Sequence, residues 1–133
     1  MPPHYVLIVE DNQDVRETLV ELLQSHGYDA VGAEHGRDAL EKLDTLQAEP
    51  CVIVLDLMMP VMDGRAFRQA QLQKPSVSGV PVIVISAYDA PAQTLKELNP
   101  AAYLRKPINL RELVRVVRTH CPRASGALTA SRP

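Results

Sequence analysis

The chain has 133 residues, of which 46% are hydrophobic and 23% are charged, and its formal net charge is −2. This length suits one well-buried core, and the composition is typical of a folded globular protein and not of a disordered or disulfide-rich chain. The scattered basic residues argue against direct binding of nucleic acid, and because neither an apolar run of roughly 20 residues nor a signal peptide is evident, we expect no membrane contact and a cytoplasmic location.

Short apolar runs of β type alternate with segments of helical period along the chain, which predicts an α/β fold of five βα units. The runs, in chain order, are residues 5–9, 29–33, 51–55, 82–85 and 101–104. The first, third and fourth are apolar at successive positions. This is expected of strands that helices cover on both faces in a parallel sheet.

The first three intervening segments have the spacing of amphipathic helices. The first is predicted to stop at Gly27, which suits the left-handed turn after a helix, and the second to stop before Pro50. The third is predicted from Gly64 to about Gln73. The side chains predicted to face the core are Val15, Leu19, Leu22, Leu23, Ala39, Leu40, Leu43, Leu46, Phe67 and Ala70.

The last two helices differ in how well they are anchored. The fourth, at about 90–98, has Leu95 and Leu98 as apolar anchors, so we expect it to be short or mobile. The fifth begins after Asn109, which with Glu112 resembles a capping box. Its predicted apolar face is Leu110, Leu113, Val114 and Val117. Residues 122–133 lack any period, so we expect one domain at 1–121 and a flexible tail.

Two residue types carry no chemistry in this interpretation. Cys51 opens an apolar run and is predicted to be a small core residue, while Cys121 is predicted to be incidental, because the two lack a Cys-x-x-Cys spacing. The four histidines are scattered without the spacing of metal ligands, and none resembles a phosphodonor.

Polar residues that can take part in catalysis or in binding lie where the apolar strands end. Glu10 and Asp11 close the first strand, Asp56 closes the third and Ser86 the fourth, and Lys106 follows the fifth. In an open α/β sheet, ligands bind beyond the carboxyl ends of the strands where the strand order reverses. For the order 2-1-3-4-5 that point lies between strands one and three. Three carboxylates would therefore share one crevice with a hydroxyl and an ammonium.

Carboxylates so close together repel one another unless a cation lies between them. Oxygen ligands suit a hard cation, and Mg²⁺ typically binds a few carboxylates together with phosphate. A carboxylate can also be the nucleophile that forms an aspartyl phosphate, while a metal and a lysine neutralise charge. The sequence therefore indicates a magnesium-dependent phosphoryl-transfer site centred on Asp56.

The segment Val54–Gly64, Val-Leu-Asp-Leu-Met-Met-Pro-Val-Met-Asp-Gly, resembles the phosphoacceptor segment of bacterial response regulators. Glu10-Asp11, Ser86-Ala87 and Lys106-Pro107 resemble the other signatures of the family and stand in the same order. The resemblance covers about residues 5–120. It implies a receiver domain like the chemotaxis regulators, with a flavodoxin-like, doubly wound, five-stranded parallel sheet of order 2-1-3-4-5 and five helices.

The resemblance also implies a role for each site residue. Asp56 would be phosphorylated, and Mg²⁺ would be held by Asp11, Asp56 and the backbone carbonyl of Met58, with Glu10 acting through a water molecule. Lys106 and Ser86 would contact phosphoryl oxygens as catalytic residues.

Three further residues follow from the same resemblance. Ser86 and Tyr103 would form the switch, and Pro107 would follow a cis peptide bond. Met58 and Tyr88 would flank the path of the water that attacks the phosphoryl group, so we expect slow dephosphorylation.

The implied function is a signalling switch that a histidine kinase or phosphotransfer protein phosphorylates. An unidentified downstream protein or output domain would read the face made by helix four, strand five and helix five, which could also form a phosphorylation-dependent dimer. The alternatives are a phosphatase or mutase with an aspartyl-phosphate intermediate and an inactive scaffold. Such hydrolases commonly need an Asp where Met58 stands, and a scaffold would be expected to lose an acidic residue or Lys106.

Two features near these motifs are given structural interpretations. Asp63 is predicted to stabilise a turn with Gly64 and not to bind metal. Arg111, Arg115 and Arg118 are predicted to be a solvated face of the last helix, with a docking surface as the alternative.

Overall fold

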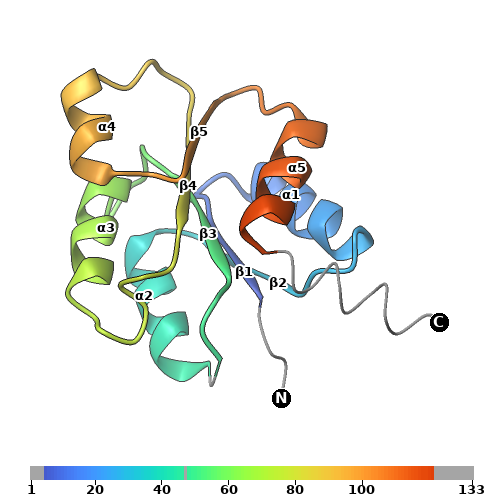
Figure 1. Ribbon diagram of the computed structural model, residues 1–133, viewed down its shortest axis with the longest axis horizontal. Helices are drawn as coiled ribbons and strands as arrows, with labels where there is room; N and C mark the ends of the chain where they lie inside the picture. Colours follow the sequence, from blue (N-terminus) through green and yellow to red (C-terminus); the bar gives the residue numbers. More distant parts are fainter. Residues whose placement is uncertain (1–4, 47, 122–133) are drawn as a thin grey trace.

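The computed structural model describes residues 5–46 and 48–121 and contains one parallel sheet of order β2-β1-β3-β4-β5 (Figure 1). This confirms the predicted topology. The strands are β1 (Val6–Val9), β2 (Ala30–Ala33), β3 (Val52–Asp56), β4 (Val82–Ser86) and β5 (Ala102–Arg105). The helices are α1 (Gln13–Ser25), α2 (Gly36–Thr45), α3 (Gly64–Leu72), α4 (Ala92–Leu98) and α5 (Leu110–His120). Within the described residues, no helix is long and apolar enough to cross a membrane.

Helices cover both faces of the sheet, which explains why its central strands are apolar at successive positions up to their carboxyl ends. α1 and α5 lie on one face, and α2, α3 and α4 lie on the other (Figure 1). In β1, Val6 and Ile8 belong to the core under α1 and α5, while Leu7 and Val9 belong to the core on the opposite face. Alternation along a strand therefore sends each side chain into one of two separate cores.

The helix ends follow local signals in the sequence. Asn12, Asp63 and Asn109 are the N-caps of α1, α3 and α5, and each side chain accepts a hydrogen bond from the backbone N–H three residues on. Gly27 lies just past α1 at a φ of 91°, as predicted for the left-handed turn. The cap at Asp63 agrees with its predicted structural role.

Three details of the predicted helices were wrong or incomplete. α2 ends at Thr45, and Leu46 turns into extended backbone with 38% of its surface exposed. In α5, Leu110 is 41% exposed because it lines an open groove against α1, while Val116, which was not predicted, is buried. The shortness predicted for α4 is confirmed by its seven residues, of which Leu98 is the buried one.

The prediction for the cysteines was wrong, since Cys51 and Cys121 form a disulfide bond. Their Cα atoms are 5.5 Å apart, although 70 positions separate them in the sequence. Cys51 directly precedes β3 and Cys121 directly follows α5. Because α5 returns toward the starting edge of the parallel strands, the fold brings these two ends together. The predicted tail, residues 122–133, lies outside the described residues.

A buried polar network anchors α4, which has few apolar contacts. Arg68 of α3 donates from Nε to the Leu98 carbonyl at 2.9 Å and from Nη2 to the Asn99 carbonyl at 3.3 Å. Its Nη1 donates to Gln71, whose amide donates in turn to the Val77 carbonyl. Burial lowers the pKa of the Arg68 guanidinium. The last carbonyls of α4 are thus satisfied by a buried cation, which is favourable at the C-terminal end of a helix.

Gly64 allows α3 to start directly against the end of β3. A Cβ atom at this position would lie 2.8 Å from the Asp56 carbonyl oxygen and 2.9 Å from Leu57 Cα. The Gly64 amide donates to the Leu57 carbonyl at 3.0 Å. The backbone that carries Asp56 therefore packs against a residue without a side chain.

We predict that Gly64→Ala destabilises the domain by about 1 to 3 kcal/mol, because the new methyl group meets backbone and not a flexible side chain. Helix propensity alone predicts the opposite sign, since Ala is the better helix former. Chemical denaturation would measure the change. Gly79→Ala is the matched control, because no described heavy atom lies within 4 Å of its added Cβ. Equal stability of the two variants would contradict the steric explanation.

Candidate functional site

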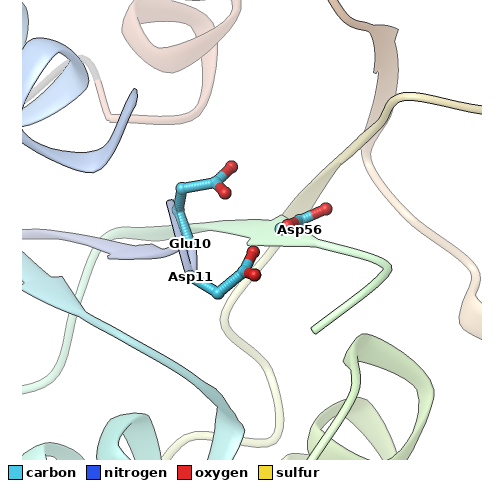
Figure 2. A group of neighbouring side chains, drawn as sticks. All are labelled: Glu10, Asp11 and Asp56. Carbon is cyan, nitrogen blue, oxygen red and sulfur yellow. The ribbon is translucent and has the colours of Figure 1, made fainter. Parts of the chain in front are cut away.

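Three carboxyl groups meet at the carboxyl ends of the two central strands. Glu10 and Asp11 directly follow β1, and Asp56 is the last residue of β3. One carboxylate oxygen from each lies within 4.8 Å of the others, and Figure 2 shows the three groups gathered in one place. Glu10 and Asp56 are buried, while Asp11 is exposed. The predicted meeting of these residues at the switch point of the sheet is thus seen in the geometry.

Lys106 closes the cluster from the end of β5. Its Nζ lies 2.8 Å from Glu10 Oε1 and 3.6 Å from Asp56 Oδ2. Burial by itself lowers the pKa of this ammonium, but the hydrogen bond to Glu10 and the nearby carboxylate charges raise the pKa above its usual value. The Lys106 amide donates to the Ser86 carbonyl, and the following peptide bond to Pro107 is cis, as the resemblance implied.

Burial and negative neighbours dominate the electrostatics of Asp56. Burial first, then the charge of Glu10 and a hydrogen bond with Asp11, raise the pKa of Asp56 from 3.8 to about 7. The Lys106 charge and the Met58 amide, which donates to Asp56 Oδ1 at 3.3 Å, act in the opposite direction without cancelling the rise. The cluster therefore has more negative charge than Lys106 neutralises.

The donor set fits a hard divalent cation. All three clustered side chains offer carboxylate oxygens, and the raised pKa of Asp56 shows that added positive charge would be favourable there. Mg²⁺ prefers such oxygen ligands, whereas structural zinc sites are typically built from Cys and His. Glu10, Asp11 and Asp56 are the side chains that could hold such an ion.

The Ser86 hydroxyl is occupied by the loop that follows β4. Its Oγ donates to the Tyr88 carbonyl at 2.7 Å and accepts from the Tyr88 amide at 3.0 Å. Ser86 is the last residue of β4, next to β3, and is buried. A contact from this hydroxyl to a phosphoryl oxygen thus requires it to leave Tyr88.

Tyr103 of β5 is bonded to the same loop. Its hydroxyl donates to the Tyr88 carbonyl at 2.9 Å and accepts from the Ala90 amide at 3.0 Å. Ser86 and Tyr103 therefore share one acceptor, the carbonyl oxygen of Tyr88. Arg105 also holds this loop, through Asp89 and the Ala87 carbonyl. The residues Met58 and Tyr88 are 59% and 66% exposed.

Sequence reasoning missed the residues that hold Glu10 in place. Arg16 donates to the Glu10 carbonyl at 2.8 Å, and the Asn12 amide donates to Glu10 Oε2 at 3.0 Å. The role of Asn12 could have been predicted, because a helix N-cap two residues after Glu10 places its backbone N–H beside the Glu10 carboxylate. Arg16 gave no local signal, since exposed arginines are common on helices. Arg111, Arg115 and Arg118 are exposed on α5, as predicted.

The sequence and the fold of this chain are similar to those of known proteins. Residues 6–118 match the family model described as the response regulator receiver domain. The chain is 33% identical over 114 residues to the response regulator MprA of Mycolicibacterium vanbaalenii, covering 84% of this chain and 48% of MprA. It is 30% identical to protein PilG of Pseudomonas aeruginosa, covering 88% of this chain and 87% of PilG. The chain thus spans about half of one curated relative and most of the other.

Solved structures include a similar fold. The chemotaxis protein CheY4 of Vibrio cholerae matches with a TM-score of 0.79 and 28% identity. The match covers 88% of this chain and 98% of that one.

We predict that Asp56→Asn raises the free energy of unfolding in metal-free buffer above pH 7. The folded-state pKa of about 7 exceeds the ordinary value of 3.8, so ionisation of Asp56 costs stability as the pH rises between these values. The gain should be complete above pH 7 and vanish below pH 4, where the carboxyl is protonated in both states. Thermal unfolding with a chelator would measure it.

Asp29→Asn is the control for this measurement, because Asp29 is exposed. It should leave the midpoint nearly unchanged at every pH. A gain from Asp56→Asn that did not vary with pH would contradict the electrostatic cause.

Proposed function

This chain belongs to the response regulator receiver domain family, and from that membership we propose that it is a phosphorylation-dependent signalling switch that receives a phosphoryl group on Asp56. The observation that carries the proposal is the buried Asp56 carboxylate at the end of β3, with two acidic neighbours and the Lys106 ammonium around it. The domain is a signalling module of two-component systems, and we propose that it catalyses only its own phosphorylation and slow dephosphorylation.

In the proposed reaction, an Asp56 carboxylate oxygen attacks the phosphorus of the donor. The bond from phosphorus to the donor imidazole or acyl oxygen breaks, its electron pair leaves with the donor, and an acyl phosphate forms on Asp56. Lys106 Nζ, 3.6 Å from Asp56 Oδ2, is placed to neutralise charge on the transferred oxygens. Asp56 must be ionised to attack, which neighbouring positive charge favours.

We propose Mg²⁺ as the cofactor, held by Asp11, Asp56 and the Met58 backbone carbonyl, with Glu10 acting through a water molecule. When bound, the ion would neutralise carboxylate and phosphoryl charge. Glu10 is already fixed by Lys106 and Asn12, so its orientation does not depend on the ion. Met58 and Tyr88 are the side chains proposed to hinder the attacking water and slow dephosphorylation.

The switch would operate through the carbonyl that Ser86 and Tyr103 share. If Ser86 Oγ turns to a phosphoryl oxygen, the Tyr88 carbonyl loses one of its two hydroxyl donors and the loop is released from β4. Tyr103 then can follow the loop or turn inward. Since α4 is short and has one buried apolar residue, its position can respond to this loop. The face of α4, β5 and α5 is the proposed readout.

The proposed phosphodonor is a histidine kinase or a histidine phosphotransfer protein, as the response regulator relatives suggest. The proposed reader is an unidentified downstream protein or output domain, and a phosphorylation-dependent dimer could use the same face. We propose no direct contact of this chain with nucleic acid or membrane.

We predict that Mg²⁺ and acetyl phosphate together add one phosphoryl group to the chain, because the site itself supplies the nucleophile and the charge neutralisation. Intact mass spectrometry would detect a label that is stable in acid and labile in base. Asp56→Asn should abolish the label. Asp11→Asn should weaken Mg²⁺ binding in a titration without unfolding the domain.

Asp63→Asn is the matched control for the labelling experiment. Asp63 is exposed and caps α3, a role that Asn also performs, so labelling should equal that of the unchanged chain. Full labelling of the Asp56→Asn variant would disprove the assignment of the acceptor.

We predict that a beryllofluoride mimic of the phosphoryl group shifts amide NMR signals most strongly from Ser86 to Val117, outside the site itself. Ser86→Ala should still permit labelling but should reduce these distant shifts. It removes the hydroxyl that is proposed to leave the Tyr88 carbonyl and bind a phosphoryl oxygen. Tyr103→Phe should reduce them at α4, because it removes the second hydroxyl on the shared carbonyl.

Ser76→Ala is the control for the switch, since Ser76 is exposed and lies between α3 and β4. Its spectrum should respond as that of the unchanged chain does. Distant shifts that clustered on α2, or that survived Ser86→Ala unaltered, would rule out this coupling route.

A further inference from the structure

The Cys51–Cys121 disulfide lies at the end of the sheet opposite Asp56. Cys51 precedes the first residue of β3, whereas Asp56 is the last residue of the same strand. We propose that this disulfide is a redox-active site, which dithiol reductants open and disulfide oxidants close in the folded domain, and which sets how firmly the end of α5 is held. This proposal is independent of phosphorylation at Asp56.

The disulfide lies beside a cavity that is open to solvent. Cys121 is 1% exposed, but Cys51 is only half-buried. Both cysteines line an open cavity of about 460 Å³, together with Glu49, Pro75 and His120. Because the cavity is open and Cys51 is the more exposed of the two cysteines, we expect a small dithiol to reach the Cys51 sulfur through it without prior unfolding. Reducing compartments convert accessible disulfides to thiols, so a bond placed in this way is reversible there.

The surroundings also accommodate the reduced form. The Cys51 sulfur lies 3.5 Å from the Tyr5 carbonyl oxygen, which can accept a hydrogen bond from the free thiol. The Cys121 amide donates to the Val117 carbonyl at 2.7 Å, so the last turn of α5 is formed by backbone bonds. Leu113 and Val117 keep α5 packed on the sheet. We therefore expect the domain to stay folded after reduction, with the Cys51 thiol and the Cys121 backbone amide both hydrogen-bonded.

The reaction is a thiol–disulfide exchange. A thiolate of the dithiol attacks the Cys51 sulfur, the bond between the cysteines breaks, and its electron pair goes to the Cys121 sulfur, which takes up a proton. The second thiol of the reagent then attacks the mixed disulfide, and Cys51 leaves as a thiolate and is protonated. The protein gains two electrons and two protons, and the reagent becomes a cyclic disulfide.

The disulfide is a covalent cross-link between the start of β3 and the end of α5. It closes a segment of the chain that contains β3, α3, β4, α4, β5 and α5. Opening this link leaves the last turn of α5 held by its own hydrogen bonds and apolar packing. α5 belongs to the exposed face made by α4, β5 and α5. The redox state of the two cysteines would therefore change the mobility of α5 in that face, starting from the end that is distant from Asp56.

Native-state reduction tests the chemistry. The oxidised chain is incubated with graded dithiothreitol in the absence of denaturant, quenched by alkylation and weighed by mass spectrometry. Both cysteines should become alkylated together, at a rate proportional to dithiothreitol, while the circular dichroism spectrum is kept. Oxidised dithiothreitol should restore the bond. A rate that is independent of dithiothreitol, or a need for denaturant, would show that unfolding comes first and would overturn the proposal.

Single variants test the direction of attack. In Cys121→Ser the remaining Cys51 thiol should be alkylated about tenfold faster than the Cys121 thiol in Cys51→Ser, because Cys51 is the more exposed residue. Equal rates would overturn the assignment of Cys51 as the sulfur attacked. The native-state reduction uses the chain without substitutions, so it tests the proposal even if a variant folds poorly.

Hydrogen exchange tests the consequence for α5. Reduction should lower the melting temperature by about 10 °C, given the length of the closed segment, and should speed exchange at residues 117–121 more than in β3. The double variant Cys51→Ser and Cys121→Ser should match the reduced chain and show no response to dithiothreitol. Identical exchange in the oxidised and reduced chains would overturn the proposed control of α5.

Discussion

The charge balance around Asp56 is the constraint that organises this end of the molecule. Three carboxylates at the ends of β1 and β3 meet opposite the Lys106 ammonium, which follows β5. Burial, together with the negative charge of Glu10, raises the pKa of Asp56 to about 7. The ion pair with Glu10 at 2.8 Å joins the outermost strand to the centre of the sheet. The site is held in a form that gains stability from any added positive charge, which is the property a cation-assisted phosphoacceptor needs.

Rigidity and freedom are divided between the sheet and the β4–α4 region. β1, β3 and β4 are buried along their lengths, and Gly64 brings α3 directly against the backbone of Asp56. In contrast, α4 has one buried apolar residue and is held at its C-terminal end by the Arg68 guanidinium. Polar contacts of this kind are directional and can exchange partners, whereas close packing resists gradual change.

The two ends of the sheet carry different chemistry on shared elements. β3 begins next to Cys51 and ends at Asp56, and α5 begins near the Lys106–Pro107 peptide and ends next to Cys121. A change at either end therefore bears on the same strand and the same helix. The two proposed inputs, phosphoryl transfer at one end and thiol exchange at the other, would both act on the face that includes α5.

The sequence by itself determined the alternation of strands and helices and the polar residues at the strand ends, because these follow from local periodicity and caps. The resemblance to response regulators implied the strand order 2-1-3-4-5, and parallel strands end at one edge of the sheet. Glu10, Asp11, Asp56 and Lys106 were placed together on this basis. Only the tertiary structure decided which distant or freely rotating groups meet. Cys51 and Cys121 are joined across 70 positions, and the Ser86 hydroxyl is bonded to Tyr88. No local pattern encodes such pairs. The path of the whole chain brings the start of β3 and the end of α5 together, and the conformation of the loop after β4 selects the partner of the Ser86 hydroxyl, which can rotate.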